Sequence, residues 1–353
     1  MLSSIRVLVP GTGSPFRCGG LSVALQTARL LSQLRPTEVV TYRTREKDHP
    51  FLEDLLAREN APGDALWLVS WGFDVPGLLK RLKGRPSVYQ AHSSGYGFEL
   101  PPGVPVISVS RNTLGYWGDR APRNPLFLLP NALESQWLQR GQRQGTANQR
   151  SIDVLLQRRK SSAYLLQTLV PALRSQGLKV EVQSGWVEDL VSQFNRACVY
   201  LYDSADYWRG RGVSEGFGLP PLEALACGCV VFSSFNHALA DLLTPGQTAH
   251  QIGQGSLEND VERILAAVSN PSGWRPDDSD LNSILAELSE ERLKERWRVV
   301  LEEIETLQIR RAIGLEAGQG LISPSYRKLR WSQRANSFRA KVVDRLPGWL
   351  LLR

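Results

Sequence analysis

Short apolar segments with the composition of β-strands alternate with helical patterns along most of this 353-residue chain. In the first part of the chain, the patterns predict strands at 5–10, 38–42, 65–70, 86–91, 104–110 and 126–129, and helices at 21–34 and 51–58. Alternation of this kind is typical of a parallel sheet covered by helices on both faces. The predicted fold class is therefore α/β, with doubly wound sheets.

The same alternation starts again after a polar segment at 136–150, whose Gly, Gln, Arg, Thr and Asn residues are typical of a linker. The patterns that follow predict strands at 152–156, 179–183, 198–202 and 229–232. They predict helices at 163–173 and 186–194, and further helices after the last of these strands up to about residue 308. A chain of this length exceeds one ordinary core. We expect an N-terminal Rossmann-like domain over 1–135, a C-terminal one over 151–310, and a ligand-binding cleft between their strand ends.

The formal net charge of +7 is concentrated in a C-terminal tail over 311–353. Its basic residues account for the whole excess, so the globular part is near neutral and nucleic-acid binding is not expected. If 326–346 is helical, one stripe holds Trp331, Ala335, Phe338, Val342 and Leu346 beside basic residues. Two interpretations stay open, binding to an anionic membrane surface and packing on the N-terminal domain.

The four cysteines, Cys18, Cys198, Cys227 and Cys229, lack the spacing of a zinc site and are interpreted as reduced thiols. The N-terminal apolar segment is too short for a signal peptide, and no apolar run is long enough to span a bilayer. We therefore expect a cytoplasmic protein that is at most peripheral to the membrane.

The most specific chemical pattern is SEGFGLPPLEA at 214–224, where a glycine loop leads into a proline-started helix between Glu215 and Glu223. A helix N-terminus offers free N–H groups and a partial positive charge to a diphosphate. A carboxylate accepts hydrogen bonds from two neighbouring sugar hydroxyls. Taken singly, Glu215 could be a solvated loop charge and Glu223 an ordinary acid in the first turn of a helix. These interpretations do not explain why the two occur as a pair around this loop, so the segment predicts a nucleotide-sugar pocket.

This segment, with the strand that follows and Asp241-Leu242-Leu243, resembles the donor site of glycosyltransferase family 4. Similar positions elsewhere are Gly19-Gly20, His92, Leu128-Leu129-Pro130-Asn131 and Ser184-Gly185-Trp186-Val187, and together they cover roughly 5–300. The resemblance implies the GT-B fold, in which two Rossmann-like domains face each other across a cleft, with a C-terminal helical tail here. It also implies retaining transfer of a hexose from a nucleoside diphosphate sugar to the hydroxyl of a carbohydrate or lipid-linked acceptor, in glycan, glycolipid or polysaccharide synthesis.

The resemblance also implies roles for the residues of the donor loop. Glu215 would contact the sugar hydroxyls beside the reacting carbon, and Glu223 would bind the ribose diol. The main-chain N–H groups of the loop would meet sugar and phosphate oxygens; these belong to Gly216, Phe217, Gly218 and Leu219.

Other matched positions lie outside that loop. Gly19 and Gly20 would let their loop approach the donor phosphate or the acceptor. His92 would hydrogen-bond the transferred sugar, unless it is a structural histidine. The remaining histidines, His49, His237 and His250, have no comparable setting.

Three adjacent cations, Arg158, Arg159 and Lys160, follow the first strand of the second domain. A cation there would stabilise the leaving diphosphate in the transition state more than in the ground state. Strand alternation would place Arg158 and Lys160 on one side. The alternative is a solvated basic strand end.

Asp278-Ser279-Asp280 is similar to the metal-binding motif of another transferase fold, but its position predicts a helix cap. No metal and no cofactor are expected beyond the donor substrate. Two other functions stay open, a non-catalytic sugar-nucleotide-binding or membrane-docking protein of the same fold and a sugar-nucleotide epimerase.

Overall fold

The computed structural model describes residues 2–59, 63–144, 150–253 and 255–312, together with Trp331 and Ala335. It divides into two compact units, Met1–Glu303 and Ile304–Arg353. The predicted amphipathic tail falls outside the described residues, except that Trp331 and Ala335 are helical and Trp331 is exposed. Within the described part, no helix is both long enough and apolar enough to cross a membrane.

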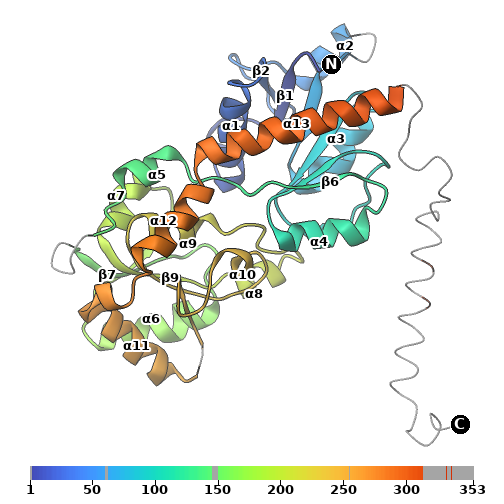
Figure 1. Cartoon of the computed structure of the whole chain (residues 1–353). Coiled ribbons are helices and arrows are strands. Elements are labelled where there is room, and N and C mark those ends of the chain that lie inside the picture. Colours follow the sequence, from blue (N-terminus) through green and yellow to red (C-terminus); the bar gives the residue numbers. More distant parts are fainter. Residues whose placement is uncertain are drawn as a thin grey trace, which may run out of the picture. The chain divides into compact units, whose positions relative to one another are not determined.

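The first sheet is entirely parallel, with strand order β2-β1-β3-β4-β5-β6. Figure 1 labels three of its strands, β1, β2 and β6. Its strands are β1 (Ile5–Val9), β2 (Thr37–Thr41), β3 (Leu66–Val69), β4 (Ser87–Ala91), β5 (Val106–Ser108) and β6 (Leu126–Leu128). Its helices are α1 (Gly19–Leu31), α2 (Leu52–Arg58), α3 (Val75–Arg81) and α4 (Arg111–Arg120). The central strands read as continuous apolar runs because helices bury both faces of a parallel sheet.

The second sheet is also parallel, with strand order β11-β10-β9-β7-β8. Its strands are β7 (Ile152–Gln157), β8 (Val180–Gln183), β9 (Ala197–Tyr202), β10 (Val230–Ser233) and β11 (His250–Gln251). Its helices are α5 (Ser135–Arg140), α6 (Val170–Ser175), α7 (Leu190–Asn195), α8 (Ala205–Arg209), α9 (Leu219–Ala226), α10 (Leu239–Leu242), α11 (Leu257–Ser269) and α12 (Asp278–Glu287). Its two faces are buried in separate clusters, one including α5, α7 and α9 and the other including α6 and α11. Both sheets lie within the first unit.

Each predicted strand matches an observed one to within a few residues, but α3, α4 and β11 have no predicted counterpart, and three further segments differ from the prediction. The helix predicted at 186–194 begins only at Leu190, where the Asp189 side chain accepts the Ser192 N–H at 3.1 Å. Loop 203–213 contains α8, and the predicted linker contains α5. Trp137 anchors α5, because its ring is buried edge-on against Phe194 at 5.4 Å. One buried aromatic therefore orders a segment whose composition is otherwise polar.

Helix α13 (Glu290–Ala312) begins in contact with both α1 and α5. The buried Glu290 carboxylate accepts hydrogen bonds from Gln26 Nε2 at 2.8 Å and from Ser135 Oγ at 2.6 Å. Lys294 reaches Gln33 at 3.1 Å. The chain thus returns to helix α1 before residue 310, which is the end predicted for the second domain.

Candidate active site

The loop 214–218 is the last part of the connection between α8 and α9, and it turns sharply at Gly218. Gly218 has φ 90°, and a Cβ there would lie 2.4 Å from Leu239 Cδ2, so only glycine fits. The N–H groups of residues 216–218 have no acceptor among the described residues. Leu219 is the first residue of α9, and the two prolines after it carry no N–H. The main chain therefore presents a row of free amides at a helix N-terminus.

Phe217 lies within that row, but its side chain points into the hydrophobic core of the second domain. Of this residue, only the amide is available to a ligand.

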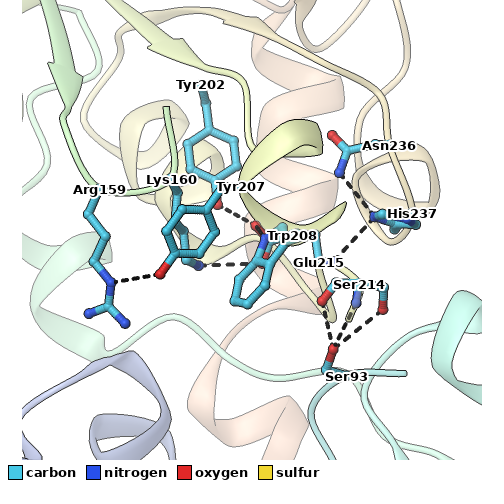
Figure 2. Close-up of polar contacts among 10 residues, drawn as sticks. All are labelled: Ser93, Arg159, Lys160, Tyr202, Tyr207, Trp208, Ser214, Glu215, Asn236 and His237. Carbon is cyan, nitrogen blue, oxygen red and sulfur yellow. Dashed lines mark hydrogen bonds and ion pairs between the residues drawn. The ribbon is translucent and has the colours of Figure 1, made fainter. Parts of the chain in front are cut away.

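Glu215 is buried, and several polar groups surround its carboxylate (Figure 2). Oε2 accepts hydrogen bonds from the Tyr202 hydroxyl and, at 2.7 Å, from Trp208 Nε1, while Lys160 Nζ lies 3.5 Å from Oε1. Burial by itself raises the pKa of Glu215, but Lys160 and these donors outweigh it and hold the pKa below its usual value. The carboxylate is thus ionised at neutral pH.

Glu223 lies one turn into α9 and has a different environment. It is half-buried, and its carboxylate makes no hydrogen bond or ion pair with any described residue. Burial, reinforced by repulsion from Glu134, raises the pKa of Glu223 to about 8, against a lowering effect of Lys160. The two acids of the loop are therefore in opposite protonation states at neutral pH.

The three candidate cations do not continue strand β7, which ends at Gln157, so strand alternation does not decide their directions. Lys160 adopts a left-handed backbone with φ 68°, which turns its side chain to Glu215 and over the Trp208 ring, at 4.8 Å from the centroid. Arg159 Nε donates to the Tyr207 hydroxyl at 3.4 Å. Arg158 is exposed. Lys160 and Arg159 thus turn toward α8, and of the two only Lys160 contacts an acid of the loop.

The segments that carry the two sheets meet where the loop after β4 contacts the loop before α9. Ser93 Oγ donates to the Ser214 carbonyl at 2.6 Å, and the Ser94 N–H donates to Ser214 Oγ at 3.1 Å. A Cβ on Gly216 would lie 1.5 Å from the carbonyl oxygen of His92. Glycine is required at 216 because another main chain occupies the space of its side chain.

His92 belongs to this domain contact. Its Nε2 is buried and has no hydrogen-bond partner among the described residues. Burial lowers the pKa of His92 to about 4, so the ring is neutral at neutral pH. An unpaired buried nitrogen is costly, and a ligand hydroxyl would satisfy it.

The predicted positions Gly19 and Gly20 lie at the start of α1. Both residues are exposed, with open space where a Cβ of Gly19 would project. Near them, Arg17 stacks over Trp186 of the second domain at 5.3 Å. These contacts bring the start of α1 to the second domain.

The acidic triplet 278–280 forms the first turn of α12, whose cap is Asp277 rather than the triplet itself. In the described part of the chain, no cluster of three or more His, Cys, Asp or Glu side chains is arranged to hold a metal ion.

Sequence reasoning missed several residues that contact Glu215. Tyr202, Trp208 and His237 all hydrogen-bond to it, although His237 has no distinctive setting in the sequence. Tyr202 is the last residue of β9, and His237 lies in the loop after β10, and the carboxyl ends of these two parallel strands lie at one edge of the sheet. That shared edge was the one available signal for them.

The family comparison matches the part of the chain that carries this loop. Residues 176–282 match the family model of glycosyl transferases group 1. This segment is similar to the group 1 glycosyltransferases and makes up less than a third of the chain. It contains both glutamates and His237, whereas Lys160 and His92 lie outside it. No curated protein in the comparison matches the sequence.

Solved structures with the same fold extend the likeness over nearly the whole chain. A sucrose-phosphate synthase from Thermosynechococcus elongatus is 14% identical, with a TM-score of 0.62, over 86% of this chain and 99% of its own. The Anabaena protein HepE, solved with UDP and glucose, is 14% identical, with a TM-score of 0.60, over 85% and 99%. A glycosyltransferase from Rickettsia africae is 10% identical, with a TM-score of 0.60, over 85% and 98%. The two parallel sheets with their surrounding helices thus form the GT-B fold, as predicted.

Proposed function

We propose that this group 1 glycosyltransferase transfers a hexose from a nucleoside diphosphate sugar to an acceptor hydroxyl, with retention and without a metal ion. The observation that carries the proposal is the position of Lys160, whose Nζ lies 3.5 Å from the Glu215 carboxylate beside the free amides that precede α9. One cation near two acids and a helix N-terminus suits a ligand that combines phosphates with sugar hydroxyls. The expected pathways are glycan, glycolipid or polysaccharide synthesis.

Each part of the donor has a complementary group in this arrangement. The diphosphate would be bound by the amides of residues 216–219 with Lys160 and Arg159. Glu223 would accept hydrogen bonds from the ribose diol, and the ionised Glu215 would accept one from the transferred sugar. Gly19 and Gly20 would leave room for the donor phosphate or the acceptor. HepE was solved with UDP and glucose, which makes UDP-glucose the first donor to test.

The chemistry needs no side-chain base. The acceptor oxygen forms a bond to the anomeric carbon as the bond to the diphosphate oxygen breaks, and the acceptor proton passes to that departing oxygen. Negative charge grows on the diphosphate, where Lys160 and the α9 amides stabilise it. His92, which is neutral and has a free Nε2, would hydrogen-bond the transferred sugar.

We expect Glu215→Ala and Glu223→Ala to separate turnover from binding. Glu215→Ala should lower kcat about 100-fold, because it removes an acceptor beside the reacting centre. Glu223→Ala should instead raise the donor KM about tenfold or more with a smaller change in kcat, because it removes a contact that is present both in the bound ground state and in the transition state. The measurement is the release of nucleoside diphosphate from UDP-, GDP- and ADP-sugars across several acceptors, with chelator present.

Glu262→Ala is a matched control, because Glu262 is an exposed acid on α11 away from the loop. Unchanged kinetics in both glutamate variants would overturn the assignment. Activity lost with chelator and restored by added metal would overturn the metal-free part alone. Donor binding without transfer or hydrolysis would favour the non-catalytic interpretation, and conversion of the donor to an isomer would indicate an epimerase.

Donor binding should also release a proton near neutral pH. Glu223 is protonated in the free protein because the pKa is about 8, and hydroxyls that donate to the carboxylate favour its ionised form. Titration calorimetry at pH 7 in buffers of different ionisation enthalpy should give a binding heat that varies with the buffer. Glu223→Gln should abolish that variation. A wild-type heat that is the same in all buffers would show that Glu223 does not meet the donor.

A further inference from the structure

Two non-glycine residues in the described part of the chain have a left-handed backbone, Lys160 with φ 68° and His237 with φ 53°. They lie in different loops, Lys160 after β7 and His237 after β10. Both contact the same residue, Glu215. Side chains other than glycine rarely adopt this conformation, and it persists where surrounding contacts impose it, most often at functional sites.

The loop that carries His237 holds the main chain of Glu215 on both sides. The Glu215 N–H donates to His237 Nδ1 at 3.3 Å, and the Ala238 N–H donates to the Glu215 carbonyl at 3.3 Å. The next residue, Leu239, packs against Gly218 at the far end of the donor loop. Figure 2 shows His237 and Lys160 approaching Glu215 from different sides.

The contacts of the His237 ring fix its protonation pattern. Nδ1 lies 3.1 Å from Asn236 Nδ2 as well as accepting the Glu215 N–H, so it faces two N–H groups. A nitrogen that faces two donors carries a lone pair, which places the ring proton of the neutral form on Nε2. The ring therefore serves as an acceptor for the amide of Glu215.

We propose that His237 is a positioning residue for Glu215. Its imidazole holds the acid's main chain while Lys160, Tyr202 and Trp208 hold its carboxylate, so that the carboxylate meets the transferred sugar in one orientation. This inference rests on the function proposed above for Glu215. It adds a residue that never touches the sugar but decides where the acid lies.

Two variants separate the ring from the backbone conformation. His237→Gly tolerates φ 53° and removes the ring, whereas His237→Asn also tolerates this conformation and keeps an acceptor oxygen on a short side chain. His237→Gly should lower kcat about 10- to 100-fold with little change in the donor KM, because small displacements of catalytic groups are costly. His237→Asn should recover much of that loss. His49→Asn, at a histidine without contacts to the loop, is the matched control.

Amide hydrogen exchange of the peptide that contains Glu215 supplies a readout independent of turnover. His237→Gly should speed exchange at this amide, and His237→Asn should restore protection. Equal exchange in the wild type and His237→Gly would overturn the inference whether or not the protein transfers sugar. Faster amide exchange in His237→Gly with an unchanged kcat would also overturn the inference. If the wild type transfers sugar from no donor while the amide exchange changes as expected, the proposed function alone would be refuted.

Discussion

Gly216→Ala should abolish nearly all transferase activity, with a loss in kcat/KM of about 100-fold or more. The new methyl group would lie 1.5 Å from the His92 carbonyl oxygen and 3.1 Å from Ser93 Cα, so it would meet main chain rather than a movable side chain. The two loops must separate by an ångström or more. That displacement would move both Glu215 and the free amides beside it.

Steady-state kinetics with the best donor, together with thermal unfolding, test this expectation. Gly115→Ala is the matched control, because its Cβ meets nothing within 4 Å in the exposed part of α4, where alanine favours the helix. Gly95→Ala should repeat the loss, since a Cβ there would lie 2.3 Å from the Gly212 carbonyl oxygen. Wild-type kinetics in a folded Gly216→Ala protein would show that the contact between the two loops is not needed for transfer.

Glu223→Gln should stabilise the unliganded protein at alkaline pH, by roughly 4 kcal/mol at pH 8. The folded-state pKa of Glu223 is raised to about 8, whereas the unfolded chain ionises near the ordinary pKa of 4.5. Between these values the unfolded state loses its proton and the folded state keeps it, so folding becomes less favourable as pH rises. Glutamine removes this penalty, and below pH 4 the substitution should have little effect.

Thermal unfolding of both proteins from pH 4.5 to pH 8.5 checks the sign. Glu215→Gln is a control of opposite direction. The lowered pKa of Glu215 stabilises the fold above the ordinary pKa of the carboxyl group, and this contribution is lost as pH falls. Glu215→Gln should therefore destabilise the protein at pH 8. If the difference in unfolding temperature between Glu223→Gln and the wild type is the same at every pH, the raised pKa of Glu223 is contradicted.

The sequence determined the parts of this protein that local patterns encode. Alternating strand and helix patterns fixed both parallel sheets, because burial on both faces requires continuous apolar strands. The segment 214–224 identified the loop that we propose binds the donor, because a left-handed Gly218 and a proline-started helix are local requirements. The basic triplet after β7 was found in the same way.

Only the tertiary structure decided how these parts meet. Sequence spacing does not show that His237, Trp208 and Tyr202 surround Glu215, because their contacts depend on where separate loops end. Nor does it show which cation faces the acid, since the left-handed turn at Lys160 overrides strand alternation. The opposite protonation of Glu215 and Glu223 also comes from the fold, because burial and neighbouring charges act through space rather than along the chain.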